Sequence, residues 1–172
     1  MRGFLFANMA TKDLSQYDVN SVPSAENMRF GLVVAEWNRE ITFALAEGAA
    51  NTLKKHGAAD ENILIKYVPG SFELPLGGQY FAEMENVDAV ILLGCVIQGE
   101  TRHFDFICQG VTQGTVDLNL KYNKPFVFGV LTTTNQQQAL DRAGGIHGNK
   151  GDEAAVTAIK MVALQRDFEN PE

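Results

Sequence analysis

The chain has 172 residues, of which 45% are hydrophobic and 20% are charged, proportions typical of a soluble globular protein. A single domain with a full hydrophobic core is expected at this length. The formal net charge of -7 argues against a general binder of nucleic acids or anionic membranes, and leaves open only a local basic pocket for a small anion.

The apolar stretches and the cysteines set further limits. The longest apolar run, AVILLGCVI (89–97), is far shorter than the ~20 residues of a membrane helix. GFLFANMA (3–10) is too short for the core of a signal peptide, and polar, acidic sequence follows it. Cys95 and Cys108 form no CxxC pair and have no histidine or cysteine at metal-ligand spacing. We therefore expect a cytoplasmic protein with no membrane span and no metal site.

The ordered pattern starts after an irregular N-terminal segment. Residues 1–27 show no sustained hydrophobic period, so we expect an extension there that is flexible or lies on a neighbouring subunit. The domain is expected over 28–172. It opens with an apolar, β-rich strand at 28–36.

A helix is predicted at 38–57, where apolar side chains recur every four residues. Asn38 and Gly57 are its expected N-cap and C-cap. His56, in the last turn, is expected to interact with this helix end rather than with a ligand.

Strand and helix continue to alternate along the rest of the chain. Further strands are predicted at 62–70, 87–97 and 124–133, and further helices at 71–84, 104–122, 135–145 and 148–168. The strand at 87–97 is apolar throughout, which is typical of a strand covered on both faces. This order predicts an α/β fold, a three-layer α/β/α sandwich around a four-stranded parallel sheet.

Side chains suited to chemistry follow the end of every predicted strand. Ligands of such sheets bind just beyond the carboxyl ends of the strands. The segments there are Glu36–Asn38, Pro69–Glu73, Gln98–His103 and Thr132–Asn135. An aromatic ring, a carboxylate, hydroxyls and a histidine would therefore converge on one edge of the sheet.

Several of these residues also have a purely structural interpretation. Trp37 could stack on a planar ligand or cap the core, and Phe72 and Phe128 could be ordinary core residues. Glu73 could favour the dipole of its helix or accept N–H groups of a heterocycle. Cys95, inside a strand, reads as a buried free thiol whose backbone could line a pocket.

The segment after the third strand suggests proton transfer next to an anion. Histidine is the side chain that changes protonation near neutral pH, and His103 stands at a helix start after a central strand. The alternative is an idle surface histidine. Gly99 allows close backbone approach, and Thr101 adds a hydroxyl and a helix-entry N–H, which suits a phosphate. Arg142 could supply the matching positive charge.

Other motifs are excluded. GGIHGNKGDEAA (144–155) lacks the Gly-Lys-Ser/Thr ending of a P-loop, and His147 within it has a structural or solvent-facing interpretation. No GxGxxG, nucleophile elbow or metal cluster is found. From the residues alone, the chain is an α/β protein, best explained as an enzyme, that holds a planar ligand and a phosphate in one site. The reaction class stays open.

Five segments, in register, resemble lumazine synthase, the family that catalyses the penultimate step of riboflavin biosynthesis. They are VPGSFELP (68–75), GCVIQGETRHFDFI (94–107), FGVLTTTN (128–135), RAGG (142–145) and GNKG (148–151). The resemblance extends from about Phe30 to Phe168. It implies condensation of 5-amino-6-(D-ribitylamino)uracil with 3,4-dihydroxy-2-butanone 4-phosphate, giving 6,7-dimethyl-8-ribityllumazine, phosphate and water, without a metal or an organic cofactor.

The resemblance also implies roles for individual residues. His103 would shuttle protons, and Trp37, a position where many relatives have phenylalanine, would stack on the pyrimidine. Glu100 is expected to contribute its N–H, since its carboxylate would repel phosphate. The aminouracil would be bound by Trp37, Asn38, Ser71, Phe72, Glu73, Cys95, Val96, Ile97, Phe128 and Lys150, and the butanone phosphate by Glu100, Thr101 and Arg142. Phe128 would come from the adjacent subunit.

For the assembly, the resemblance implies a flavodoxin-like subunit whose N-terminal extension adds an edge strand to a neighbour's sheet. Subunits would form a homopentamer with sites at the interfaces. The short turn RAGGIHGNKG (142–151) is similar to that of members that build sixty-subunit shells. Association with riboflavin synthase is a further expectation from the resemblance. Two rival hypotheses stay open: an inactive shell protein, and a flavin-binding module that would purify yellow.

Overall fold

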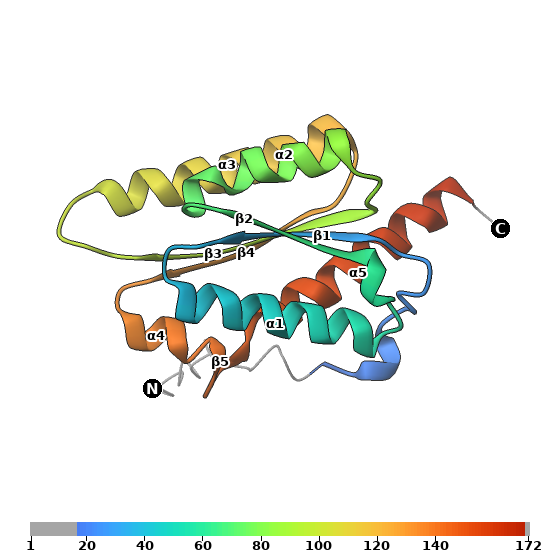
Figure 1. Ribbon diagram of the computed structural model, residues 1–172, viewed down its shortest axis with the longest axis horizontal. Helices are drawn as coiled ribbons and strands as arrows, with labels where there is room; N and C mark the ends of the chain where they lie inside the picture. The colour runs from blue at the N-terminus through green and yellow to red at the C-terminus, as the bar shows by residue number, and fades with distance from the viewer. Residues whose placement is uncertain (1–16, 171–172) are drawn as a thin grey trace, which may run out of the picture.

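Four parallel strands form the central sheet of the computed structural model, which describes residues 17–170 (Figure 1). They are β1 (Phe30–Ala35), β2 (Ile63–Val68), β3 (Ala89–Ile97) and β4 (Phe126–Thr133), in the spatial order β2-β1-β3-β4. The central strand β1 is buried along its whole length, and β3 is buried as far as Cys95. Both faces of these strands are covered, which explains their unbroken hydrophobicity and confirms the predicted parallel sheet.

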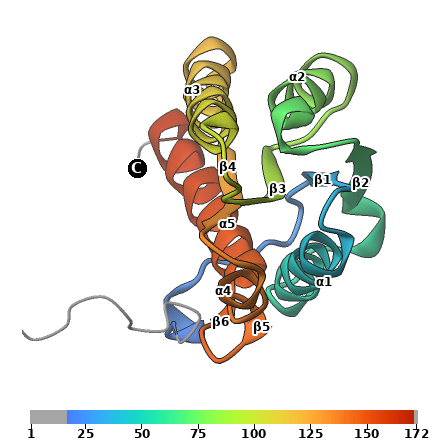
Figure 2. The same cartoon turned by 90° about the vertical axis from the view of Figure 1, so that its left-hand side faces the viewer.

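Helices cover both faces of the sheet. Figure 1 shows α1 (Arg39–Lys55) and α5 (Lys150–Glu169) on one face, and α2 (Leu74–Met84) and α3 (His103–Tyr122) on the other. Successive strand residues point to opposite faces, so neighbours such as Leu32 and Val33 belong to two different hydrophobic clusters. The three-layer sandwich is therefore confirmed. An end-on view shows the strands between the two helix layers (Figure 2).

The predicted helix at 135–145 is wrong over its second half. Helix α4 spans only Gln136–Leu140, and a short hairpin of β5 (Ala143–Gly145) and β6 (Gly148–Asn149) follows it. Within the hairpin, Gly144 and Gly148 have φ values of 110° and 70°, left-handed conformations that glycine adopts readily and that do not continue a helix. Helix α5 accordingly begins at Lys150 rather than at 148.

The ends of α1 differ in detail from the prediction. Asn38 occupies the N-cap position, but its backbone is left-handed (φ 58°) and its side chain makes no capping bond. His56 is the C-cap, and Gly57 follows it with φ 103°. The ring of His56 lies at this helix end, with its Nε2 3.0 Å from the hydroxyl of Tyr17, as expected for a structural histidine.

Short 3₁₀ turns complete the chain: η1 (Val19–Ser21), η2 (Asp60–Asn62) and η3 (Ser71–Glu73), the last of which leads into α2. Residues 17–27 pack against the α/β domain of the same chain. The N–H of Ala25 donates to the carbonyl of His56 (2.8 Å), and the Ala25 side chain is fully buried. The expected strand exchange with a neighbour falls largely on residues 1–16, outside the described residues. Within 17–170, no helix is long and apolar enough to cross a membrane.

Candidate active site

The connections after β1 and β2 place the aromatic and acidic candidates side by side. Beyond the strands, the parallel ladder continues: Glu36 N–H donates to the carbonyl of Val68 (2.8 Å), and Trp37 N–H to that of Pro69 (3.0 Å). The backbone of Trp37 is thus held beside the turn that starts α2. Its indole is 68% exposed and lies against Gly70. Such a ring offers an open face for stacking.

The turn after β2 holds Glu73 and Phe72 in place. The N–H of Gly70 donates to Oε2 of Glu73 (3.1 Å), which fixes one carboxylate oxygen at the start of α2. Phe72 is 57% exposed, and its ring edge approaches Gly110 of α3. An oriented carboxylate next to an exposed aromatic ring can accept the N–H groups of a planar heterocycle.

The carbonyl of Cys95 joins three strand ends. It accepts a bond of 2.9 Å from Nδ2 of Asn38, after β1, and one of 3.5 Å from Oγ of Ser71, after β2. Burial raises the pKa of the Cys95 thiol to about 11, so this thiol is neutral and a poor nucleophile at neutral pH. This agrees with the structural interpretation of the thiol. Val96 and Ile97 follow it half-buried at the end of β3.

The loop between β3 and α3 is exposed and carries the third group of candidates. Glu100, Thr101 and His103 all have exposed side chains. The N–H of His103 lies 3.4 Å from the hydroxyl of Thr101, a weak contact at the first residue of a 20-residue helix. The first N–H groups of a helix have no partner within it and attract anions. Figure 1 shows this loop at the same end of the molecule as the start of α1.

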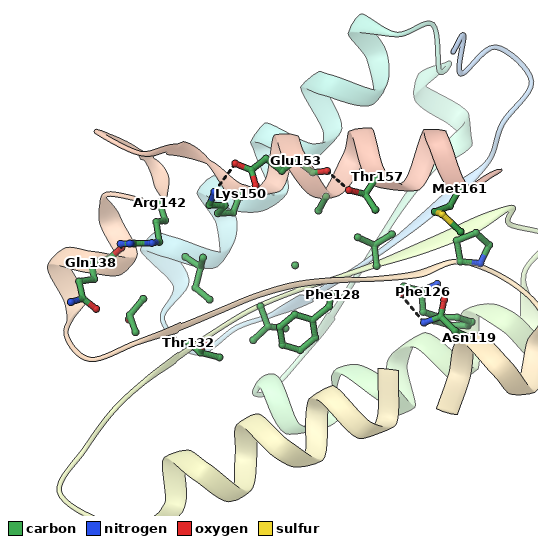
Figure 3. A pocket seen from close by; sticks show the side chains of 17 residues that line it. Asn119, Phe126, Phe128, Thr132, Gln138, Arg142, Lys150, Glu153, Thr157 and Met161 are labelled. Atoms are coloured by element: carbon green, nitrogen blue, oxygen red, sulfur yellow. Dashed lines mark hydrogen bonds and ion pairs between the residues drawn. The ribbon is translucent and has the colours of Figure 1, made fainter. Parts of the chain in front are cut away.

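The remaining candidates line a groove of about 580 Å³ along β4, the last strand of the sheet (Figure 3). Arg142 and Lys150 line it near α4, with the guanidinium of Arg142 beside Gln138 and the amine of Lys150 facing Glu153. The ring of Phe128 lies on the other side of the β4 ribbon. Nη1 of Arg142 donates to the carbonyl of Gln138 (2.9 Å), which steadies the guanidinium. Phe128 is 40% exposed.

Sequence reasoning missed four polar residues of this groove: Asn119, Gln138, Glu153 and Thr157. Glu153 forms an ion pair with Lys150, with Nζ and Oε1 2.6 Å apart and both side chains largely buried. The i,i+3 spacing of the two charges on one helix was a signal that could have indicated it. Gln138, whose carbonyl holds Arg142, left no comparable signal. In the part of the chain that the structure describes, no three His, Cys, Asp or Glu side chains gather to hold a metal ion.

The candidates therefore form two groups in one chain. Those after β1, β2 and β3 lie at the carboxyl ends of the strands: Trp37, Asn38, Ser71, Phe72, Glu73, Cys95, Val96, Ile97, Glu100, Thr101 and His103. Arg142 and Lys150 lie in the groove along β4, and Phe128 lies on β4 itself with its ring on the other side of that strand. A planar ring and its edge groups can be held by the first group, and an anion by the cations of the second.

The chain is similar to known proteins over most of its length. The family model described as 6,7-dimethyl-8-ribityllumazine synthase matches residues 27–166. A protein of that name from Parabacteroides distasonis is 63% identical over 153 residues, covering 89% of this chain and 96% of its own. The counterpart from Cytophaga hutchinsonii is 61% identical over 154 residues, covering 90% and 96%. The one from Phocaeicola vulgatus is 56% identical over 160 residues, covering 93% and 95%. Since both the family model and these relatives span nearly all of the sequence, the chain belongs to the 6,7-dimethyl-8-ribityllumazine synthase family.

Proposed function

We propose that the chain condenses 5-amino-6-(D-ribitylamino)uracil with 3,4-dihydroxy-2-butanone 4-phosphate to 6,7-dimethyl-8-ribityllumazine, phosphate and water, in riboflavin biosynthesis. The observation that carries this proposal is the joint placement of Trp37 and Glu73 around Gly70, in a family member 63% identical to a named synthase. Trp37 covers one face of the pyrimidine. Glu73 accepts N–H groups from its edge.

The first chemical step is attack of the uracil's amine on the ketone of the butanone phosphate. Water leaves and an imine forms. Elimination of phosphate then gives an enol, which rearranges to a ketone, and the second nitrogen attacks that ketone and closes the ring with loss of another water. Each step moves a proton, and the exposed imidazole of His103 at the start of α3 is the group assigned to that work. Holding two reactants side by side increases the rate further, because the entropy of bringing them together is lost on binding and not in the chemical step.

The phosphate is held by the loop before α3 together with Arg142. Thr101 supplies a hydroxyl, and the N–H groups at the entry of the helix favour a negative charge. Glu100 contributes through its backbone. Arg142, whose guanidinium is steadied by Gln138, neutralises the phosphate as it leaves.

We infer that this site is completed by a second subunit. The register places Phe128 opposite Leu92, and Leu92 opposite Val33, so Trp37 lies two strands away and four residues further along. At ~4.8 Å per strand and ~3.3 Å per residue, the two Cα atoms are about 16 Å apart. Side chains on a strand stand roughly perpendicular to the sheet and do not close this gap. Two rings that sandwich one ligand lie about 7 Å apart, twice a van der Waals contact.

Phe128 of one chain therefore serves the site of its neighbour. Arg142 and Lys150 line the groove beside β4, so they serve the same neighbouring site as Phe128. Several large apolar side chains are exposed in a single chain, and burial in an interface would remove them from water, which supports an assembly. They are Phe106, Val116, Leu120, Leu164 and Phe168. The assembly proposed is a homopentamer, with a sixty-subunit shell and its association with riboflavin synthase as the larger form.

The test is to mix the purified protein with both substrates and follow the absorbance and fluorescence of the lumazine. The uncatalysed rate is subtracted, and one phosphate is expected per lumazine formed. His103→Ala is expected to lower the catalysed rate by ~10²–10⁴-fold while the assembly stays intact. A well-assembled wild-type protein that does not accelerate the reaction would leave the inactive shell protein, and stoichiometric bound flavin would favour the flavin-binding module.

A further inference from the structure

Gly70 stands where two groups of the proposed site meet. Its backbone is extended, with φ -137° and ψ 178°, a conformation open to any residue. The need for glycine is therefore one of space. A Cβ atom at this position would lie 2.5 Å from Cε3 and 2.7 Å from Cζ3 of Trp37, closer than carbon atoms approach without displacement.

The indole is brought over Gly70 by the backbone that carries it. The bond from Trp37 N–H to the carbonyl of Pro69 (3.0 Å) fixes the Cα of Trp37 beside this turn. With the backbone fixed, a side chain on residue 70 could be accommodated only by rotation of the ring. The ring is 68% exposed and has room to rotate, so the fold would survive while the stacking face moved.

The same glycine controls the carboxylate of Glu73. Its N–H donates to Oε2 of Glu73 at 3.1 Å, and a Cβ on Gly70 would lie 3.2 Å from that oxygen, tighter than ordinary contact. One residue thus orients both the face that stacks on a planar ring and the group that bonds to its edge.

We propose that Gly70 is a positioning residue for the aminouracil: it leaves room for the Cε3–Cζ3 edge of the Trp37 indole beside the turn and keeps the Glu73 carboxylate next to it. This inference rests on the proposed function. Gly70 does not itself carry out a chemical step. It sets the angle between the stacking face and the edge group, and so acts on the binding of one substrate and not on that of the other.

The test variant is Gly70→Ala, and the chain provides its own probe. Trp37 is the only tryptophan, so its emission reports directly on the ring. The aminouracil is added alone, without the butanone phosphate, so that binding is measured without turnover. The expected results are a shifted emission maximum in the free variant, weaker quenching by the aminouracil, and a KM for the aminouracil about tenfold higher. The kcat and the KM for the butanone phosphate should change little, as expected when only uniform binding is lost.

Two further variants separate positioning from general damage. Gly114→Ala, on α3, places a Cβ 2.9 Å from Pro75, a similar crowding elsewhere, and should leave Trp37 emission and both KM values unchanged. Trp37→Phe removes the six-membered ring of the indole, including Cε3 and Cζ3, the two atoms nearest the new methyl group. In the Gly70→Ala background, Trp37→Phe should raise the KM for the aminouracil less than it does in the wild type, because the smaller ring no longer meets the new methyl group. If Gly70→Ala alone does not assemble, the double variant should assemble and match Trp37→Phe.

The possible failures are distinguishable. If the aminouracil does not alter wild-type Trp37 emission, stacking by Trp37 is refuted, and the role of Gly70 with it. If the wild type responds but folded Gly70→Ala has the same emission and the same KM, only the inference about Gly70 is overturned. A rise in both KM values together, or a double variant that does not assemble, would also overturn it, since either would point to general distortion.

Discussion

Two variants that each damage one half of the site should restore activity when they are mixed within one oligomer. Trp37→Ala removes the aromatic face after β1, and Phe128→Ala removes the aromatic ring on β4. Stacking of a base on an aromatic side chain is worth about 1–3 kcal/mol, so each variant should lose roughly 5- to 150-fold in kcat/KM for the aminouracil.

The gain on mixing follows from the register. Because the Cα atoms of Trp37 and Phe128 are about 16 Å apart in one chain, a complete sandwich needs two chains. In a ring of randomly mixed subunits, half of the chains retain each residue, so about a quarter of the interfaces contain both. Equal co-expression should therefore recover about a quarter of the wild-type activity, well above the average of the two separate variants.

The assay is the rate of lumazine formation by the mixed oligomer, isolated with a different tag on each variant. The matched control mixes Trp37→Ala with the double variant Trp37→Ala/Phe128→Ala, in which every interface lacks the indole. The rate of lumazine formation by that mixture should equal the average of its two components. If the mixture of single variants also stays at the average of its components, although it has co-assembled, both rings serve the same chain and the proposed interface site is refuted.

Three other predictions concern stability and reactivity. The side-chain amide of Asn119 pairs with both the N–H and the carbonyl of Phe126, each at 2.9 Å, so Asn119→Ala should lower the free energy of unfolding by about 2 kcal/mol; an unchanged urea midpoint would contradict this. Burial, and next the charge of Lys55, lower the pKa of His56 in the folded protein. As the pH falls below 6.5, the unfolded chain therefore binds a proton at this histidine before the folded chain does. The free energy of unfolding decreases as a result, until the pH has passed the folded pKa. Thermal unfolding between pH 8 and 5 should show this loss, and His56→Gln should reduce it. Cys95, with its pKa raised to about 11, should react slowly with iodoacetamide at pH 8 in the native protein and fast after unfolding; equal rates would refute its burial.

The glycine-rich segment after α4 shows where local patterns mislead. Residues 135–145 carry enough helix-forming side chains to suggest one continuous helix. The helix instead ends at Leu140, and a hairpin follows in which Gly144 and Gly148 adopt left-handed conformations. These glycines were visible in the sequence, but a glycine can end a helix or merely weaken it, and only its φ distinguishes the two cases.

Local chemistry by itself determined the layers of this protein and the edge at which its ligands are expected. Alternating strands and helices require a parallel sheet covered on both faces, and such a sheet gathers its strand ends at one edge. Only the tertiary structure decided which candidates meet. Asn38 and Ser71 share the carbonyl of Cys95, Trp37 crosses Gly70, and Phe128 is separated from all of them along β4. These contacts join residues far apart in the sequence, and they depend on strand order and register, which periodicity within a single segment does not encode.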